Sequence, residues 1–294
     1  MAQRNATPGH NVTKAFLEER AQFVRLETVR LTKIAGAGHY SSTFSAAELL
    51  ACLYYGRMRI DPARPDWADR DRFVLSKGHI AIGLYPILAD LGYFDGKLLD
   101  DYTRLGSAFG DHPDMKKIPG CDFSSGSLGH GLSVCLGMAL AARAEKRNYR
   151  AYCMLGDGEL NEGQVWEAAM AAGHFGTRNL VAIVDRNRLQ IDGATEEIMS
   201  VEPIHDRFAS FGWDVQRIDG HDIDAVLAAL DNLPEGTHGK PQCIVADTIK
   251  GRGVAMMELA LNWHVGNLVG RDYDAVIEEI KAGLKPVTAT EVRR

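Results

Sequence analysis

The chain has 294 residues, of which 46% are hydrophobic and 24% charged, with a formal net charge of −6. This acidic balance argues against a general nucleic-acid-binding protein, and no apolar run reaches the roughly 18 residues of a membrane-spanning helix. The polar start MAQRNATPGHNVTKA lacks the apolar segment of a signal peptide. Five scattered cysteines without a C-x-x-C pair are typical of reduced thiols. We therefore expect a cytoplasmic protein that binds neither nucleic acid nor membrane.

The N-terminal part of the chain is expected to be helical after a flexible start over residues 1–14. Apolar residues at helical spacing predict an amphipathic helix over 15–34, followed by glycines that permit a turn. Ser45 and Glu48 have the spacing of a capping box, which predicts that a second helix begins there and continues to Tyr55.

The next part alternates a strand, a helix and a glycine-rich loop. A short strand is expected over 72–75 and a helix over 81–91. The loop SSGSLGHG (124–131) precedes a helix of small residues that ends near Glu145. Its glycines let backbone N–H groups approach a ligand and let the helix pack closely.

Two apolar runs, 151–155 and 180–184, predict strands joined by a crossover helix. The remaining elements are a helix over 203–211, a strand over 213–218, a helix over 222–230, a strand over 242–248 and a helix over 273–282. This alternation predicts one α/β domain over residues 15–284, a parallel sheet with helices on both faces, followed by a polar tail over 285–294.

Two oxygen-bearing side chains follow neighbouring strands. Asp157, within the turn Gly156-Asp157-Gly158, and Asn187 each come directly after a predicted strand. The carboxyl ends of parallel strands meet at one sheet edge, where ligands bind. Carboxylate and amide oxygens suit Mg²⁺ or Ca²⁺, and the Leu189 carbonyl could add a third oxygen. The pattern indicates a diphosphate held through a divalent cation; the alternative is a plain glycine turn.

Four histidines lie at predicted element boundaries: His39, His79, His112 and His264. Neutral imidazoles at one sheet edge could donate hydrogen bonds to hydroxyl groups and move protons near neutral pH. The alternative is that each is a surface or capping residue, as we expect for His10, His174, His205, His221 and His238. Glu162 and Glu167 can likewise be explained as acidic residues near a helix N-terminus.

Taken together, these segments resemble transketolase, in its N-terminal, diphosphate-binding half. The resemblance rests on GAGHY, DRFVLSKGH, DHPD, SSGSLGHG, GDGELNEG, DRNRLQIDG and KGRG…NWH, in that order, over residues from Ala15 to about Gly270. It implies the parallel-sheet thiamine diphosphate-binding fold, with thiamine diphosphate and Mg²⁺ (or Ca²⁺) as cofactors.

The resemblance also implies a role for each matched residue. Asp157, Asn187 and the Leu189 carbonyl would bind the metal. The cofactor would be contacted by Gly156, Gly158, His79, His264, Leu128 and Ile191. The donor sugar would be bound by His39, His112 and His264, of which His39 and His264 would assist removal of the C3 hydroxyl proton. Glu162 and Glu167 would lie at a subunit interface.

Three positions depart from the family pattern. Arg186 stands where an asparagine or aspartate is more usual, and His130 where glutamine is frequent. Tyr40 follows His39 in place of proline, which suggests an altered sugar pocket.

The resemblance covers only the diphosphate-binding half of transketolase. It therefore predicts a split enzyme whose C-terminal, pyrimidine-binding half is a separate chain, in an α₂β₂ assembly acting on sugar phosphates. The expected reaction is transfer of a two-carbon ketol unit from a ketose phosphate to an aldose. Alternatives are the α subunit of a thiamine diphosphate-dependent 2-oxo acid dehydrogenase, 1-deoxyxylulose-5-phosphate synthase, and a catalytically silent cofactor-binding subunit.

Overall fold

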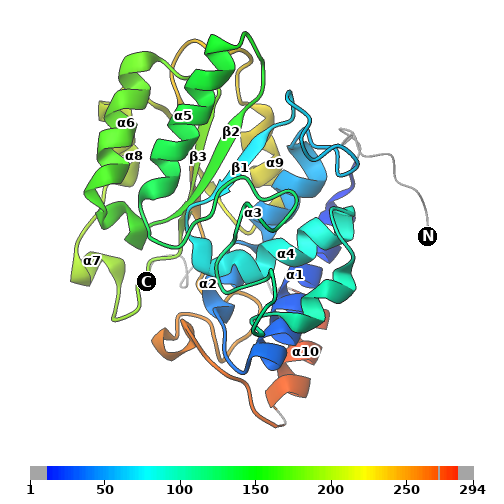
Figure 1. Cartoon of the computed structure of the whole chain (residues 1–294). Coiled ribbons are helices and arrows are strands. Elements are labelled where there is room, and N and C mark those ends of the chain that lie inside the picture. Colours follow the sequence, from blue (N-terminus) through cyan, green and yellow to red (C-terminus); the bar gives the residue numbers. More distant parts are fainter. Residues whose placement is uncertain (1–11, 271, 284–294) are drawn as a thin grey trace.

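The computed structural model describes residues 12–270 and 272–283. Their strands form one five-stranded sheet in the order β1-β2-β3-β5-β4, with every neighbouring pair parallel (Figure 1). The strands are β1 (Arg72–Leu75), β2 (Ala151–Gly156), β3 (Leu180–Arg186), β4 (Asp214–Asp219) and β5 (Gln242–Asp247). The predicted parallel sheet is confirmed. Residues 1–11 and 284–294, which include most of the predicted flexible start and the polar tail, lie outside the described residues.

The helices surround this sheet, and most lie where the sequence predicts them. They are α1 (Lys14–Ala35), α2 (Tyr40–Ser45), α3 (Ala47–Ala51), α4 (Ala81–Leu91), α5 (His130–Ala144), α6 (Gly163–Phe175), α7 (Thr195–Ile198), α8 (Ile204–Ser210), α9 (Ile223–Asp231) and α10 (Asp272–Lys281). A π-helix, Cys52–Arg57, continues α3. Short 3₁₀ turns occupy Gly78–Ile80, Gly96–Asp101, Gly158–Asn161 and Leu261–Trp263. None of these helices is both long and apolar enough to cross a membrane.

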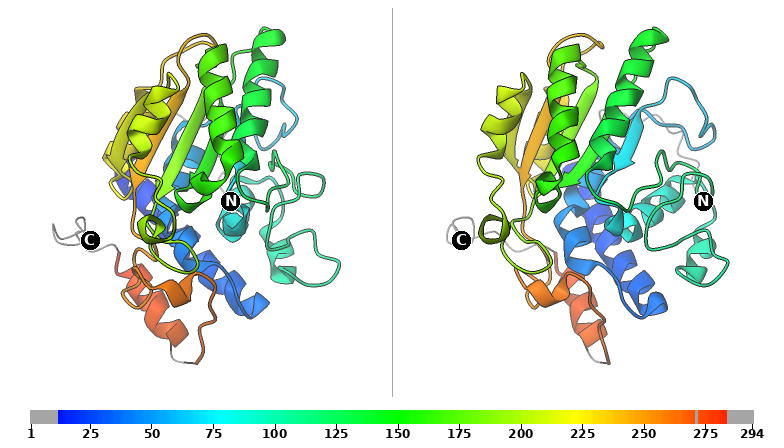
Figure 2. Two further views of the ribbon diagram at one scale, coloured as in Figure 1. Left: turned by 90° about the vertical axis from the view of Figure 1, so that its left-hand side faces the viewer. Right: turned by 60° about the vertical axis from the view of Figure 1, so that its left-hand side comes forward.

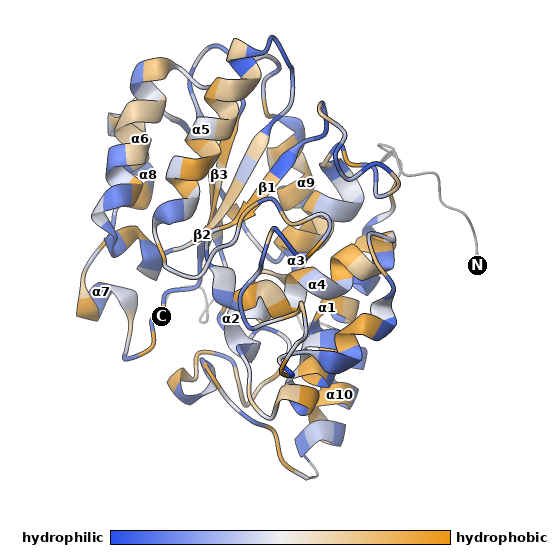
Figure 3. Ribbon diagram, in the orientation of Figure 1, coloured by the Kyte–Doolittle hydropathy of each residue, from blue (hydrophilic) through white to orange (hydrophobic). Residues whose placement is uncertain are grey.

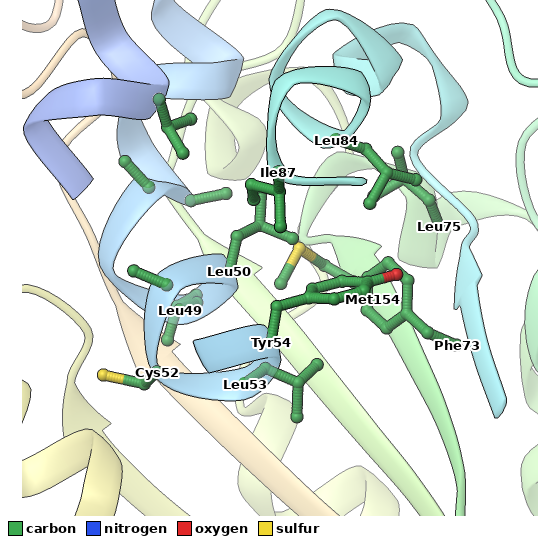
Figure 4. Packing of buried hydrophobic residues seen from close by; sticks show 14 of the residues in the cluster. Leu49, Leu50, Cys52, Leu53, Tyr54, Phe73, Leu75, Leu84, Ile87 and Met154 are labelled. Carbon is green, nitrogen blue, oxygen red and sulfur yellow. The ribbon is translucent and has the colours of Figure 1, made fainter. Parts of the chain in front are cut away.

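Two apolar layers sandwich the sheet (Figures 1 and 2). One face packs against α1, α3, α4 and α9; there Tyr54, Phe73 and Met154 meet leucines of α3 (Figure 4). The other face packs against α5, α6 and α8. Because β2, β3 and β5 are covered on both faces, they are apolar along most of their length, as the hydropathy colouring shows (Figure 3).

The predicted capping box at Ser45 is wrong. Ser45 is the last residue of α2, a short helix that the sequence analysis missed, and its hydroxyl donates to Asp185 Oδ2 at 2.7 Å. Glu48 accepts two hydrogen bonds from the Arg25 guanidinium, at 2.6 and 2.9 Å. Both residues therefore satisfy buried partners from distant segments, which a local capping pattern does not reveal.

His221 was expected at the surface, and this prediction is also wrong. Its side chain is 5% exposed and its Nδ1 lies 2.9 Å from Glu48 Oε2. Its Nε2 accepts a hydrogen bond from the Ile249 amide at 2.8 Å. The Arg25–Glu48–His221 network thus joins α1 and α3 to the segment that follows β5.

Candidate active site

A cavity of about 330 Å³ opens at the carboxyl ends of the central strands. The segments after β3 and β5 lie at this end of the sheet (Figure 2). Every residue predicted to bind cofactor, metal or sugar lines it: His39, His79, His112, Leu128, Gly156, Asp157, Gly158, Asn187, Leu189, Ile191 and His264. The structure therefore brings together residues from seven separated segments, as the sheet-edge argument requires.

Asp157 is a buried carboxylate held by the backbone around it. Its Oδ2 accepts the Arg188 amide at 2.7 Å and its Oδ1 accepts the Gly158 amide at 2.9 Å. Burial, followed by the negative charge of Asp185, raises the pKa of Asp157 to about 6. A cation beside this carboxylate would relieve both effects.

The residues next to Asp157 supply further oxygens of the kind that Mg²⁺ binds. The hydrogen bond from Arg188 to Asp157 holds the segment that contains Asn187 and Leu189 beside the carboxylate, and Asp157, Asn187 and Leu189 all line the cavity. Within the described residues, no group of three or more His, Cys, Asp or Glu side chains is arranged to hold a metal. The set of one carboxylate, one amide and one backbone carbonyl instead fits a hard cation whose remaining ligands come from a diphosphate and water.

A buried ion pair that the sequence analysis did not assign lies beneath the cavity. Lys77 and Asp185 are 1% and 0% exposed, and the Lys77 ammonium donates to Asp185 Oδ2. Burial by itself raises the pKa of Asp185, but the charge and hydrogen bond of Lys77 outweigh it and hold the pKa below its usual value. Both residues belong to motifs noted above, Lys77 to SKGH and Asp185 to DRN. Their position at the ends of predicted strands was the only sign in the sequence that they lie near the cavity.

Glu159 links two glycine-containing turns beside the cavity. Its carboxylate accepts hydrogen bonds from the Ser76 hydroxyl, the Gly129 amide at 2.8 Å and the Gly156 amide at 3.0 Å. Burial raises the pKa of this carboxyl above its usual value. The amides of Gly156 and Gly158 already have protein acceptors. A Cβ on Gly156 would meet nothing within 4 Å, so this glycine leaves room for a ligand, whereas a Cβ on Gly158 would lie 2.8 Å from the Gln190 side chain.

Backbone pairing between distant segments brings two of the histidines together. Gly38 and Gly266 form an antiparallel bridge, and the Ser41 hydroxyl donates to the Trp263 carbonyl at 2.8 Å. The ring centroid of His39 consequently lies 5.4 Å from that of His264 and 5.1 Å from that of His79.

Burial and neighbouring lysines keep two of these imidazoles neutral. Burial, followed by the charge of Lys77, places the pKa of His79 well below its usual value. Burial, followed by the charge of Lys250, lowers the pKa of His264 to about 3. The Lys250 ammonium lies 2.8 Å from His264 Nδ1 and 3.0 Å from the Leu189 carbonyl, so it connects the histidines of the cavity to the segment that follows β3.

A model of the family described as "Transketolase, thiamine diphosphate binding domain" matches residues 17–294. The chain belongs to the transketolase family. The resemblance drawn from the ordered motifs is thereby confirmed, and the description of the family names thiamine diphosphate as the cofactor that this domain binds.

Individual relatives agree with this assignment. The 6-deoxy-6-sulfo-D-fructose transketolase subunit SqwG of Clostridium sp. is 42% identical, with 90% of this chain and 96% of that protein covered. An apulose-4-phosphate transketolase subunit of Phocaeicola vulgatus is 40% identical, with 90% and 93% covered. The solved transketolase of Campylobacter jejuni matches 96% of this chain with a TM-score of 0.85 at 28% identity. The chain spans only 46% of that structure's length.

The three departures from the transketolase pattern have separate structural explanations. Tyr40 is 0% exposed, packs against Phe44 and Trp263, and does not itself line the cavity; its effect on a sugar pocket stays a prediction. Arg186 forms ion pairs with Glu202 and Asp247. His130 is exposed and its Nδ1 contacts the Leu128 carbonyl at 3.1 Å.

Other predicted residues lie at the rim of the cavity or away from it. Leu128 is 36% and Ile191 64% exposed, which is unusual for large apolar side chains beside a cavity. Glu162 and Glu167 are exposed at the start and on the surface of α6, outside the cavity.

Proposed function

We propose that the chain is the diphosphate-binding subunit of a two-chain transketolase, which transfers a two-carbon ketol unit from a ketose phosphate to an aldose. The observation that supports it best is one cavity in which a desolvated oxygen-ligand set and three adjacent imidazoles meet. The metal set alone would fit many diphosphate-binding proteins, whereas the histidines add groups suited to a polyhydroxylated substrate.

The diphosphate end is assigned to a divalent cation, Mg²⁺ by preference, bound by Asp157, Asn187 and the Leu189 carbonyl. Lys250 supplies a positive charge there, and neutral His79 and His264 can donate hydrogen bonds to phosphate oxygens. The open space next to Gly156, where a Cβ would meet nothing within 4 Å, leaves room for the group.

Bound thiamine diphosphate supplies the electron sink for breaking a carbon–carbon bond next to a carbonyl. This chain's residues orient the sugar and move its protons. His39 and His264 are assigned to the donor's C3 hydroxyl, and His112, at the exposed rim, to its C1 oxygen. His264 stays neutral at pH 7 because of its low pKa, so it serves as a hydrogen-bond partner before it accepts any proton.

A second chain is proposed to complete the site in an α₂β₂ assembly. This chain covers 96% of the Clostridium relative and 93% of the Phocaeicola relative, both named as transketolase subunits. Separate chains of this length therefore occur in the family. Exposed apolar side chains gather at the cavity rim: Leu128, Ile191, Ile198 and, next in sequence, Met199. Such a patch marks an interaction surface. Glu162 and Glu167, exposed nearby, are assigned to contacts between subunits.

The 2-oxo acid dehydrogenase alternative is not favoured, because the relatives described above are transketolase subunits. A cytoplasmic location agrees with five cysteines that are all free thiols.

The test uses the chain mixed with a pyrimidine-binding transketolase subunit. Thiamine diphosphate and Mg²⁺ are titrated into this mixture, and ketol transfer from a pentulose phosphate to an aldose is then assayed. We expect saturable, EDTA-sensitive binding and ketol transfer, and loss of metal-dependent cofactor retention in Asp157→Ala. Absence of binding, or turnover of a 2-oxo acid without ketol transfer, would refute the proposal.

A further inference from the structure

Asp111 faces the catalytic candidate His39 from behind the cavity. His39 Nδ1 is buried and makes no hydrogen bond of standard geometry within residues 12–270 and 272–283. The nearest carboxylate oxygen is Asp111 Oδ1, 3.5 Å away. A buried ring nitrogen this close to a carboxylate fits a base and the group that orients it, since such contacts are often long before substrate binds.

The carboxylate of Asp111 is itself held in place. Its Oδ1 accepts the hydroxyl of the fully buried Tyr102 at 3.3 Å, and the preceding residue's carbonyl, that of Gly110, accepts the Tyr85 hydroxyl at 2.9 Å. Its interaction with His39 lowers the pKa of Asp111 against the opposing effect of burial, so the carboxylate remains ionised. Asp111, whose side chain is 42% exposed, is therefore a negative charge anchored by Tyr102 beside His39.

The charges around the His39 ring make this carboxylate important. His79 and His264 pack against the ring, and behind them Lys77 and Lys250 hold both imidazoles neutral. His112 lies on the other side of Asp111, with its Nδ1 4.0 Å from Oδ2. Asp111 is thus the negative charge that faces His39 within a surrounding of cations and neutral imidazoles.

We propose that Asp111 is a positioning residue for His39: it holds the proton on Nδ1, presents Nε2 to the cavity, and stabilises the ring when it becomes positively charged. The inference rests on the proposed ketol transfer. In the donor half-reaction the C3 O–H bond breaks and an Nε2–H bond forms as the carbon–carbon bond is cleaved. In the acceptor half-reaction the same proton goes to the oxygen of the aldose carbonyl, which restores neutral His39.

The kinetic test compares wild type, Asp111→Asn and Asp111→Glu, each assayed with the pyrimidine-binding partner chain. A matched control is Asp101→Asn, which removes an exposed carboxylate in the preceding segment. For Asp111→Asn we expect kcat to fall about 10- to 100-fold. The acidic limb of the kcat/KM profile should move about 0.5–1 pH unit lower, because a weaker base releases its proton at a lower pH. Thiamine diphosphate affinity should stay within about twofold, and Asp111→Glu should recover part of the limb. Equal profiles for Asp111→Asn and Asp101→Asn would overturn the proposal.

A second readout does not depend on catalysis. The full chain is labelled with ¹⁵N-histidine, and the NMR signals of His39 are identified by their absence in His39→Gln. In wild type these signals should show the proton on Nδ1. In Asp111→Asn the balance between the two tautomers should shift. An unchanged tautomer in a folded Asp111→Asn chain refutes the role of Asp111. Lack of ketol transfer by wild type refutes the proposed function instead, so the two failures are distinguishable.

Discussion

Replacing Asp157 by asparagine should stabilise the metal-free chain while abolishing its metal site. The pKa of this buried carboxyl rises from 3.8 to about 6 on folding. A difference of about two pKa units, at about 1.4 kcal/mol each, means that the ionised group lowers the free energy of unfolding at pH 7 by about 3 kcal/mol. The introduced asparagine would turn its amide nitrogen towards a backbone donor, with a loss of about 1 kcal/mol. The net gain is therefore about 2 kcal/mol, or roughly 4–8 °C in Tm.

The sign of the pH dependence makes the reasoning testable. The folded chain binds the Asp157 proton more tightly than the unfolded chain, so the destabilisation is absent below pH 3.8, grows towards pH 6 and is complete above it. Urea unfolding of wild type and Asp157→Asn in EDTA should show the gain at pH 7 and none at pH 4.

Cofactor should reverse this order of stability. With thiamine diphosphate and Mg²⁺ at about 100 times Kd, wild type gains about 2.7 kcal/mol by mass action and the variant does not. The exposed Asp101→Asn change serves as control and should move neither value. An Asp157→Asn chain that is less stable than wild type at pH 7, or equally stabilised at both pH values, would refute the reasoning.

Two further changes test a buried ion pair and a cation beside the cavity. Glu48→Gln breaks a buried ion pair with Arg25 and should lower the free energy of unfolding by about 3–5 kcal/mol in urea denaturation. Arg25 holds the pKa of Glu48 at about 2 despite burial, so this stability should be present above pH 4.5 and decline as pH falls towards 2; a flat acid profile contradicts the assignment. Lys250→Met removes a cation whose pKa burial lowers to about 8, so Tm should change little while calorimetry shows thiamine diphosphate binding weakened about tenfold or more. Unchanged affinity would remove Lys250 from the site.

Local pattern was sufficient for the sheet and for the residues at its strand ends. The apolar runs before Asp157 and Asn187 are long and bounded by turn residues, and parallel strands direct their carboxyl ends to one edge, so the convergence of these two side chains follows from elementary geometry. The histidines could be selected because they stand at element boundaries next to glycine or proline.

Residues whose role depends on distant partners could not be predicted. Ser45 has a capping sequence around it, but its hydroxyl bonds to Asp185 on β3. His221 has no apolar neighbours in sequence to indicate burial, yet Glu48 and the Ile249 amide enclose it. Lys77 and Lys250 resemble ordinary strand-end lysines until the fold places both beside the same cavity.

The pairing of Gly38 with Gly266 also sets an order of assembly. The sheet needs no residue beyond the end of β5 at Asp247. The cavity, in contrast, lacks His264 and the constraint on His39 until the segment after β5 has returned to the start of α2. A chain emerging from the ribosome can therefore pair its strands before the segment that carries His264 has followed, so the proposed cofactor cavity is complete only when the last of the sheet-edge segments is in place.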